Sequence, residues 1–206
     1  MTDLNPVWRE PFYTVKEFYN WKINAEAGNS VEISNKEKTD LLQWERTDTL
    51  YSFQKIYQIG LQLPDYSDQL VKARETVKGR ISDRNTQSLL CVKMQSLNEE
   101  IEKTEFLSVY FYLGNVIPIW PGGNQDKGAG YDLPEPYFNK NIYWTDCLLN
   151  KYHNACMSDI INSQVDTTKI RTDSKAYFDY LSSRRDIIIK RTKELSAIIN
   201  QILYSR

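Results

Sequence analysis

The stretch Phe111-Tyr-Leu-Gly-Asn-Val-Ile-Pro-Ile-Trp-Pro-Gly-Gly-Asn-Gln-Asp-Lys-Gly128 constrains the backbone more than any other part of this sequence. Five of the eight glycines lie between Gly114 and Gly130, and four of the seven prolines lie between Pro118 and Pro136. Glycine and proline mark unusual backbone geometry. A segment that combines them with aromatic and polar side chains is typical of a binding or active site. We therefore expect the functional surface within residues 111–137.

The residues on either side of Gly114-Asn115 predict a small β-hairpin. Residues 106–113 are rich in Phe, Tyr and Val, which favour strands. Gly-Asn accepts the positive φ angles of a two-residue hairpin turn. Residues 116–120 would form the second strand, which Pro118 restricts to a sheet edge or a bulge.

The rest of the chain has helical spacing of its apolar residues. The capping pattern Ser34-x-x-Glu37 opens a long helix that Gly60 ends. Further helices are expected over residues 14–22, 66–77, 85–103 and 137–156, and a final one over 175–204 is capped by Thr172-Asp173. We expect a mainly α protein with a small β-hairpin (α+β), a single-domain helical bundle packed around the Gly/Pro-rich loop. This domain covers residues 1–206, with 1–33 as a peripheral N-terminal arm.

Composition excludes several classes of protein. The 206 residues are 41% hydrophobic and 26% charged with a net charge of −1, so nothing global favours nucleic acid or an anionic membrane. No apolar run approaches the ~18 residues of a membrane-spanning helix. The first ten residues lack the basic and apolar regions of a signal peptide. Three cysteines without framework spacing fit a reducing compartment. We expect a cytoplasmic protein without a membrane partner.

No metal or cofactor is predicted. Cys147, His153 and Cys156 lie close in sequence, and Cys91 is a distant fourth candidate ligand. His153 and Cys156 share a helix face, but Cys147 lies about 240° around from His153 and points elsewhere. The spacing favours buried cysteines and a structural histidine over zinc.

The Gly/Pro-rich loop and the last helix carry the candidate binding residues. The loop offers backbone amides and Lys127 to an anion, but it is not a Walker A loop. The spacing of Arg184, Ile188, Arg191 and Leu195 puts them on one helical stripe, within reach of loop carboxylates such as Glu135. A structural tie between helix and loop is the alternative to a cationic pocket. The candidate ligand-binding residues are Asn115, Asn124, Lys127, Tyr131, Arg184 and Arg191.

Two basic clusters indicate an alternative partner. They comprise Lys72, Arg74, Lys78, Arg80 and Arg84, and then Arg184, Arg185, Lys190, Arg191 and Lys193. Such clusters are usually solvated helix faces. Nucleic acid becomes the partner if both lie on one surface.

The sequence predicts a strand, the Leu113-Gly114-Asn115 turn, a second strand, a loop that carries Asn124 and then a helix. This order of elements resembles the ββα unit of HNH-type nucleases, notably those of modification-dependent restriction enzymes. The resemblance implies a general base at Phe111 or Tyr112, where this chain has no histidine. Such a unit would be inactive as an HNH nuclease, because neither side chain takes a proton at neutral pH.

The chain also resembles an uncharacterised bacterial protein family, a domain of unknown function. The likeness rests on Asp48-Thr49-Leu-Tyr-Ser52-Phe53, Gly114-Asn115-Val-Ile-Pro118, Asn124-Gln-Asp-Lys127-Gly128 and Leu181-Ser-Ser-Arg184-Arg185 through Arg191. It covers residues 45–195 and implies a fold and a bacterial or phage setting, but no activity.

Three functions are compatible with these residues. The first is a non-catalytic binding or interaction module that uses the 111–137 loop, with a protein partner. The second is a divergent ββα enzyme acting on nucleic acid through Asn115, Asp126 and Lys127. The third is a small-molecule or nucleotide binder with a pocket at Trp120 and Tyr131. No catalytic motif is complete, so whether the protein is an enzyme stays open.

Overall fold

The computed structural model describes residues 47–118, 133–136, 160 and 163–204. Within these residues the protein is mainly helical, as the sequence predicts. The predictions for residues 1–46, 119–132 and 137–159 lie outside the described part. They include the N-terminal arm, the helix start at Ser34 and the helix over 137–156.

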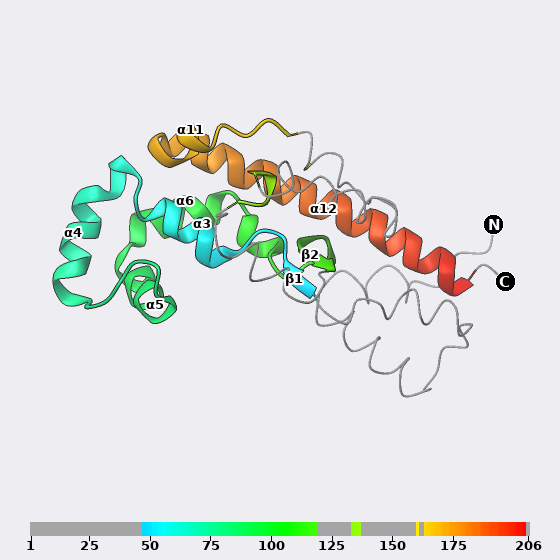
Figure 1. Ribbon diagram of the computed structural model, residues 1–206, viewed down its shortest axis with the longest axis horizontal. Helices are drawn as coiled ribbons and strands as arrows, with labels where there is room; N and C mark the ends of the chain where they lie inside the picture. The colour runs from blue at the N-terminus through cyan, green and yellow to red at the C-terminus, as the bar shows by residue number, and fades with distance from the viewer. Residues whose placement is uncertain (1–46, 119–132, 137–159, 161–162, 205–206) are drawn as a thin grey trace.

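The C-terminal helix α12, Ser174–Tyr204, forms one long side of the described structure (Figure 1). Its 31 residues span roughly 46 Å at the usual helical rise. The Asp173 carboxylate accepts a hydrogen bond from the Ala176 amide at 3.1 Å, which confirms the predicted cap. The short helix α11, Thr167–Thr172, precedes it. Elements η3 (Phe106–Val109), η4 (Leu113–Asn115), α6 (Gln95–Lys103) and α11 pack against α12.

The remaining helices follow the sequence closely. Helix α3, Phe53–Gly60, ends at the predicted glycine, and the 3-10 turn η2, Pro64–Tyr66, follows it. Helix α4, Ser67–Thr76, lies within the predicted 66–77 range. The predicted helix over 85–103 is two helices, α5 (Arg84–Lys93) and α6, which meet at Met94. Helices α4 and α5 pack together at the end of the structure far from the C-terminus (Figure 1).

Two predictions about local structure are wrong. Residues 47–49 do not continue a long helix but form strand β1, Thr47–Thr49, and α3 begins only at Phe53. The predicted hairpin around Gly114-Asn115 is absent, because residues 106–109 and 113–115 are 3-10 turns. Strand β2, Val116–Pro118, instead pairs antiparallel with β1, and Asp48 lies opposite Ile117. The strand lies where the sequence predicts one, but its partner is far away in sequence.

The hydrophobic core lies between α12 and the segments from residue 50 to residue 113. Its largest fully buried side chains are Tyr51, Tyr57, Tyr177, Phe106, Leu50, Ile56, Ile59 and Leu61. Tyr177 on α12 donates a hydrogen bond to the Ile56 carbonyl at 3.0 Å, so the core ties α12 to α3. This packing places the start of the 111–137 segment against the middle of α12.

Candidate functional site

Gly114 lies in close contact with α12. Its amide donates to Thr192 Oγ1 at 2.9 Å, and its carbonyl accepts from Arg191 Nη1 at 3.1 Å. A Cβ built on Gly114 would lie 2.1 Å from the Ile188 carbonyl oxygen. Gly114 is not among the described glycines with positive φ, whereas Gly79 is. Close packing therefore requires glycine here, and the turn conformation expected from the sequence does not.

Asn115 bonds two other stretches of backbone, residues 50–51 and residue 110, from a fully buried position. Its side-chain Oδ1 accepts from the Tyr51 amide at 2.9 Å, and its Nδ2 donates to the Tyr110 carbonyl at 2.8 Å. Its backbone carbonyl accepts from the Leu50 amide at 2.7 Å. An asparagine with both ends of its amide bonded in the core organises the fold at this point.

The predicted stripe on α12 is confirmed, since Arg184, Ile188, Arg191 and Leu195 are all buried. Arginine is almost never fully buried unless its charge is paired. Arg191 meets this condition in part by binding the Gly114 carbonyl. Two of the five residues in the C-terminal basic cluster, Arg184 and Arg191, are thus buried. The cluster is therefore not the solvated helix face that the sequence indicates.

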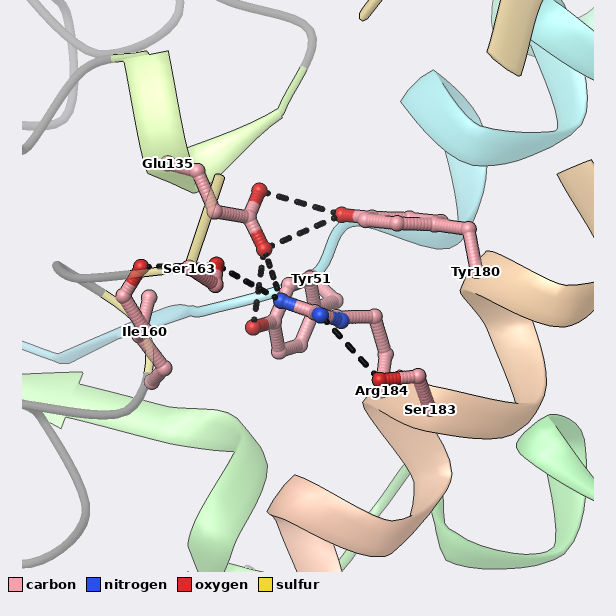
Figure 2. Close-up of polar contacts among 7 residues, drawn as sticks. All are labelled: Tyr51, Glu135, Ile160, Ser163, Tyr180, Ser183 and Arg184. Carbon is pink, nitrogen blue, oxygen red and sulfur yellow. Dashed lines mark hydrogen bonds and ion pairs between the residues drawn. The ribbon is translucent and has the colours of Figure 1, made fainter. Parts of the chain in front are cut away.

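Arg184 belongs to a buried polar cluster with Tyr51, Glu135 and Tyr180 (Figure 2). Its Nη1 lies 2.5 Å from Glu135 Oε1, and the two side chains are 7% and 1% exposed. The Tyr51 and Tyr180 hydroxyls donate to the same carboxylate at 3.2 Å each. The Arg184 guanidinium also lies 4.9 Å from the Tyr180 ring centroid, within range of a cation–π contact.

Serine hydroxyls complete the surroundings of Arg184. Nη1 donates to Ser163 Oγ at 3.2 Å, and Nη2 donates to Ser183 Oγ at 3.1 Å (Figure 2). Ser163 in turn donates to the Ile160 carbonyl at 2.9 Å. One arginine on α12 thus binds Glu135 and Ser163, which is the structural tie expected between loop and helix.

Burial dominates the protonation behaviour of this cluster. Desolvation raises the pKa of the Glu135 carboxyl, while the positive charge of Arg184 opposes that shift. Desolvation and the nearby Glu135 charge raise the pKa of Tyr51 and of Tyr180 well above the ordinary value. Both phenols therefore stay protonated and act as hydrogen-bond donors. Perturbed groups often mark functional sites, but these four side chains bond chiefly to one another and are buried away from solvent.

A groove with a volume of about 370 Å³ lies between residues 105–112 and α12. One wall comes from the start of the 3-10 region, with Glu105, Ser108, Val109 and Tyr112. The other wall is α12, with Arg185, Ile189, Thr192 and Lys193. Arg185 bonds Glu105 and Asp186 at 2.9 Å each, and Lys193 is exposed. The groove combines apolar and hydroxyl side chains with the Glu105–Arg185 ion pair and Lys193.

The structure thus places three of the six candidate ligand-binding residues. Asn115, Arg184 and Arg191 are buried and hydrogen-bonded within the protein. Asn124, Lys127 and Tyr131 lie outside the described residues, as do Cys147, His153 and Cys156. Among the described residues, no group of His, Cys, Asp and Glu side chains could hold a metal ion.

Sequence reasoning missed the partners that complete both buried junctions. Tyr51, Tyr180 and Ser163 surround the ion pair, and Thr192 binds Gly114. Two of the four carried a signal, since Tyr180 precedes Arg184 by four positions on the same helix and Thr192 directly follows Arg191. Tyr51 and Ser163 come from distant segments that only packing brings together.

Comparison with known proteins supplies no relative from which a role could be transferred. No protein-family model, curated protein or solved structure matches this chain. None of the helices in the described part is both long enough and apolar enough to cross a bilayer. The site is therefore interpreted from its own geometry.

Proposed function

We propose that this protein is a non-catalytic binding module whose binding surface forms where the 111–137 segment meets α12. The observation that carries this proposal is the groove of about 370 Å³ between residues 105–112 and α12. Buried junctions hold Gly114 and Glu135 against α12, and Asn115 is bonded to Tyr51. A rigid surface of this kind binds a partner at low cost in conformational entropy.

Binding accounts for the polar residues better than catalysis does. A catalytic side chain has to reach its substrate. Asn115 and Glu135 are 0% and 1% exposed, and each is saturated by internal hydrogen bonds. Asn124, Lys127 and Tyr131 stay candidate contact residues on the same segment.

The groove favours a peptide of a partner protein that carries an apolar side chain beside a carboxylate. The half-buried side chains of Tyr112 and Ile189 offer apolar contact, and Lys193 offers an exposed positive charge. Phe111, the first residue of the segment, is 69% exposed. Aromatic side chains exposed beside a pocket are common anchors in protein interfaces.

Panning a random peptide library on the purified protein tests this proposal. Two variants of exposed groove residues, Ser108→Arg and Lys193→Glu, should each weaken the enriched peptides by about tenfold or more, the scale expected when one anchoring side chain of an interface is replaced. Lys175→Glu reverses an exposed charge elsewhere on α12 and serves as the matched control. Peptides that bind all four proteins equally, or no enrichment at all, would refute the assignment.

The enzyme hypothesis stays a prediction. It needs Asn115, Asp126 and Lys127 together on a ββα unit, and the last two lie outside the described residues. Asn115 is bonded to backbone in the core. Nicking of plasmid DNA that depends on a divalent cation and is lost in Asp126→Ala would support the enzyme over the binding module.

A further inference from the structure

A second surface lies on α4, α5 and the connection between them, residues 77–83. This stretch, residues 67–93, carries six basic and three acidic side chains in a protein of net charge −1. The basic residues are all exposed: Lys72, Arg74, Lys78, Arg80, Arg84 and Lys93. No ion pair between described residues involves any of the six. The positive charge therefore faces solvent.

The three acidic residues offset half of this charge, so positive charge remains in excess. Asp83 caps α5, where its Oδ2 accepts from the Thr86 amide at 3.0 Å and from the Thr86 hydroxyl at 2.9 Å. These bonds lower the pKa of Asp83. Its ionised carboxylate is held at the start of α5, and together with Asp68 and Glu75 on α4 it leaves six basic against three acidic side chains on this surface.

The connection that carries Lys78 and Arg80 has a fixed conformation. Gly79 has a φ of +132°, and an added Cβ would lie 2.0 Å from Thr86 Oγ1. Buried Gln87 donates to the Ile81 carbonyl at 2.8 Å, and Arg74 donates to the Gly79 carbonyl at 3.1 Å. The connection is held against α5, so its basic side chains are presented from a preorganised support.

Helix α5 has one face in the protein and one in solvent. Thr86, Gln87 and Leu90 are buried. The outer face consists of Arg84, Asn85, Ser88, Leu89 and Val92, which are all exposed. Steps of three and four residues keep these side chains on one stripe. Leu89 and Val92, at 56% and 83% exposure, have no described partner that covers them.

We propose that this surface binds double-stranded DNA, with α5 in the major groove and the basic residues of the connection on the phosphates. Arg, Asn and Ser hydrogen-bond to base edges, and small apolar side chains contact the thymine methyl group. Lys78 and Arg80 flank the start of α5, as phosphate contacts flank a recognition helix. An anionic membrane suits the face less well, because its apolar residues are few and interrupted by Arg84, Asn85 and Ser88.

The test is fluorescence anisotropy with a labelled mixed-sequence DNA duplex, using the full chain. The triple variant Lys78→Glu/Arg80→Glu/Arg84→Glu changes exposed side chains only. It should lower affinity by about 10- to 100-fold at moderate salt and reduce the salt slope by roughly 0.9 for each phosphate that the protein no longer neutralises. The control triple variant, Lys103→Glu/Lys169→Glu/Lys175→Glu, changes the net charge equally and should bind nearly as the wild type does.

Three outcomes would overturn the proposal. The wild type could fail to bind the duplex at micromolar concentration. Both triple variants could weaken binding equally, which would leave only net charge as the cause. The surface could instead bind vesicles rich in anionic lipid, or an acidic protein segment, in preference to the duplex. Circular dichroism of each variant confirms that a loss of binding does not reflect unfolding.

Discussion

Replacing Gly114 with alanine tests whether close packing on α12 is the reason for this glycine. The added Cβ would lie 2.1 Å from the Ile188 carbonyl oxygen, 2.6 Å from Thr192 Oγ1 and 2.8 Å from the Thr192 amide. Real Cβ atoms essentially never lie within 3.0 Å of such atoms, so η4 and α12 would have to separate by about 0.9 Å. Two of the three obstacles are backbone atoms, which cannot rotate away.

The cost follows from the interactions that such a shift disturbs. Overpacking costs about 1–3 kcal/mol. Each buried hydrogen bond left unmade, from the Gly114 amide to Thr192 and from Arg191 to the Gly114 carbonyl, costs about 1–3 kcal/mol. Because one shift causes both effects, we expect a total loss of about 3–5 kcal/mol in the free energy of unfolding.

Urea denaturation followed by the helical circular dichroism signal measures this loss, and Gly60→Ala is the matched control. At Gly60 the added Cβ would lie 2.8 Å from the Tyr177 hydroxyl and 3.3 Å from Leu97 Cδ1, so the overlap is smaller and involves side-chain atoms only. Gly60→Ala should therefore cost clearly less than Gly114→Ala. A loss below about 1 kcal/mol at Gly114 would refute the packing argument, since a change that small lies within ordinary surface effects.

The buried ion pair gives two further predictions. Glu135→Ala should cost about 3–5 kcal/mol because it strands the Arg184 charge, whereas Glu135→Leu/Arg184→Met should cost much less; equal unfolding free energies for the two variants would contradict this. Burial raises the pKa of Glu135 in the folded protein above its ordinary value of about 4.3. The stability that this carboxyl contributes is therefore fully present at a pH below that ordinary pKa, and it is lost as the pH rises through the folded-state pKa. The difference in unfolding free energy between wild type and Glu135→Gln should then decrease from acidic to neutral pH. A difference that increases instead would mean that the attraction of Arg184 lowers the pKa of Glu135 by more than burial raises it. Finally, protein purified without chelator should contain no stoichiometric zinc by elemental analysis; a zinc signal that disappears in Cys156→Ser would overturn this prediction.

The sequence by itself determined the elements whose signals are local. Helical spacing and the Asp173 cap located α12 to within a residue at its start. The same spacing put Arg184 and Arg191 on one stripe, and both are buried as that stripe requires. Gly60 ended α3 as expected. These features depend on interactions between residues three or four positions apart, which a sequence displays directly.

Only the tertiary structure decided the contacts between distant segments. Residues 106–109 contain strand-forming side chains, yet they form a 3-10 turn that packs on α12. Strand β2 pairs with β1, and Asn115 bonds Tyr51, 64 positions away. Gly114 is glycine because Ile188 and Thr192 leave no space for a Cβ. Packing selects such partners from many residues of equal local propensity, so periodicity and turn chemistry cannot identify them.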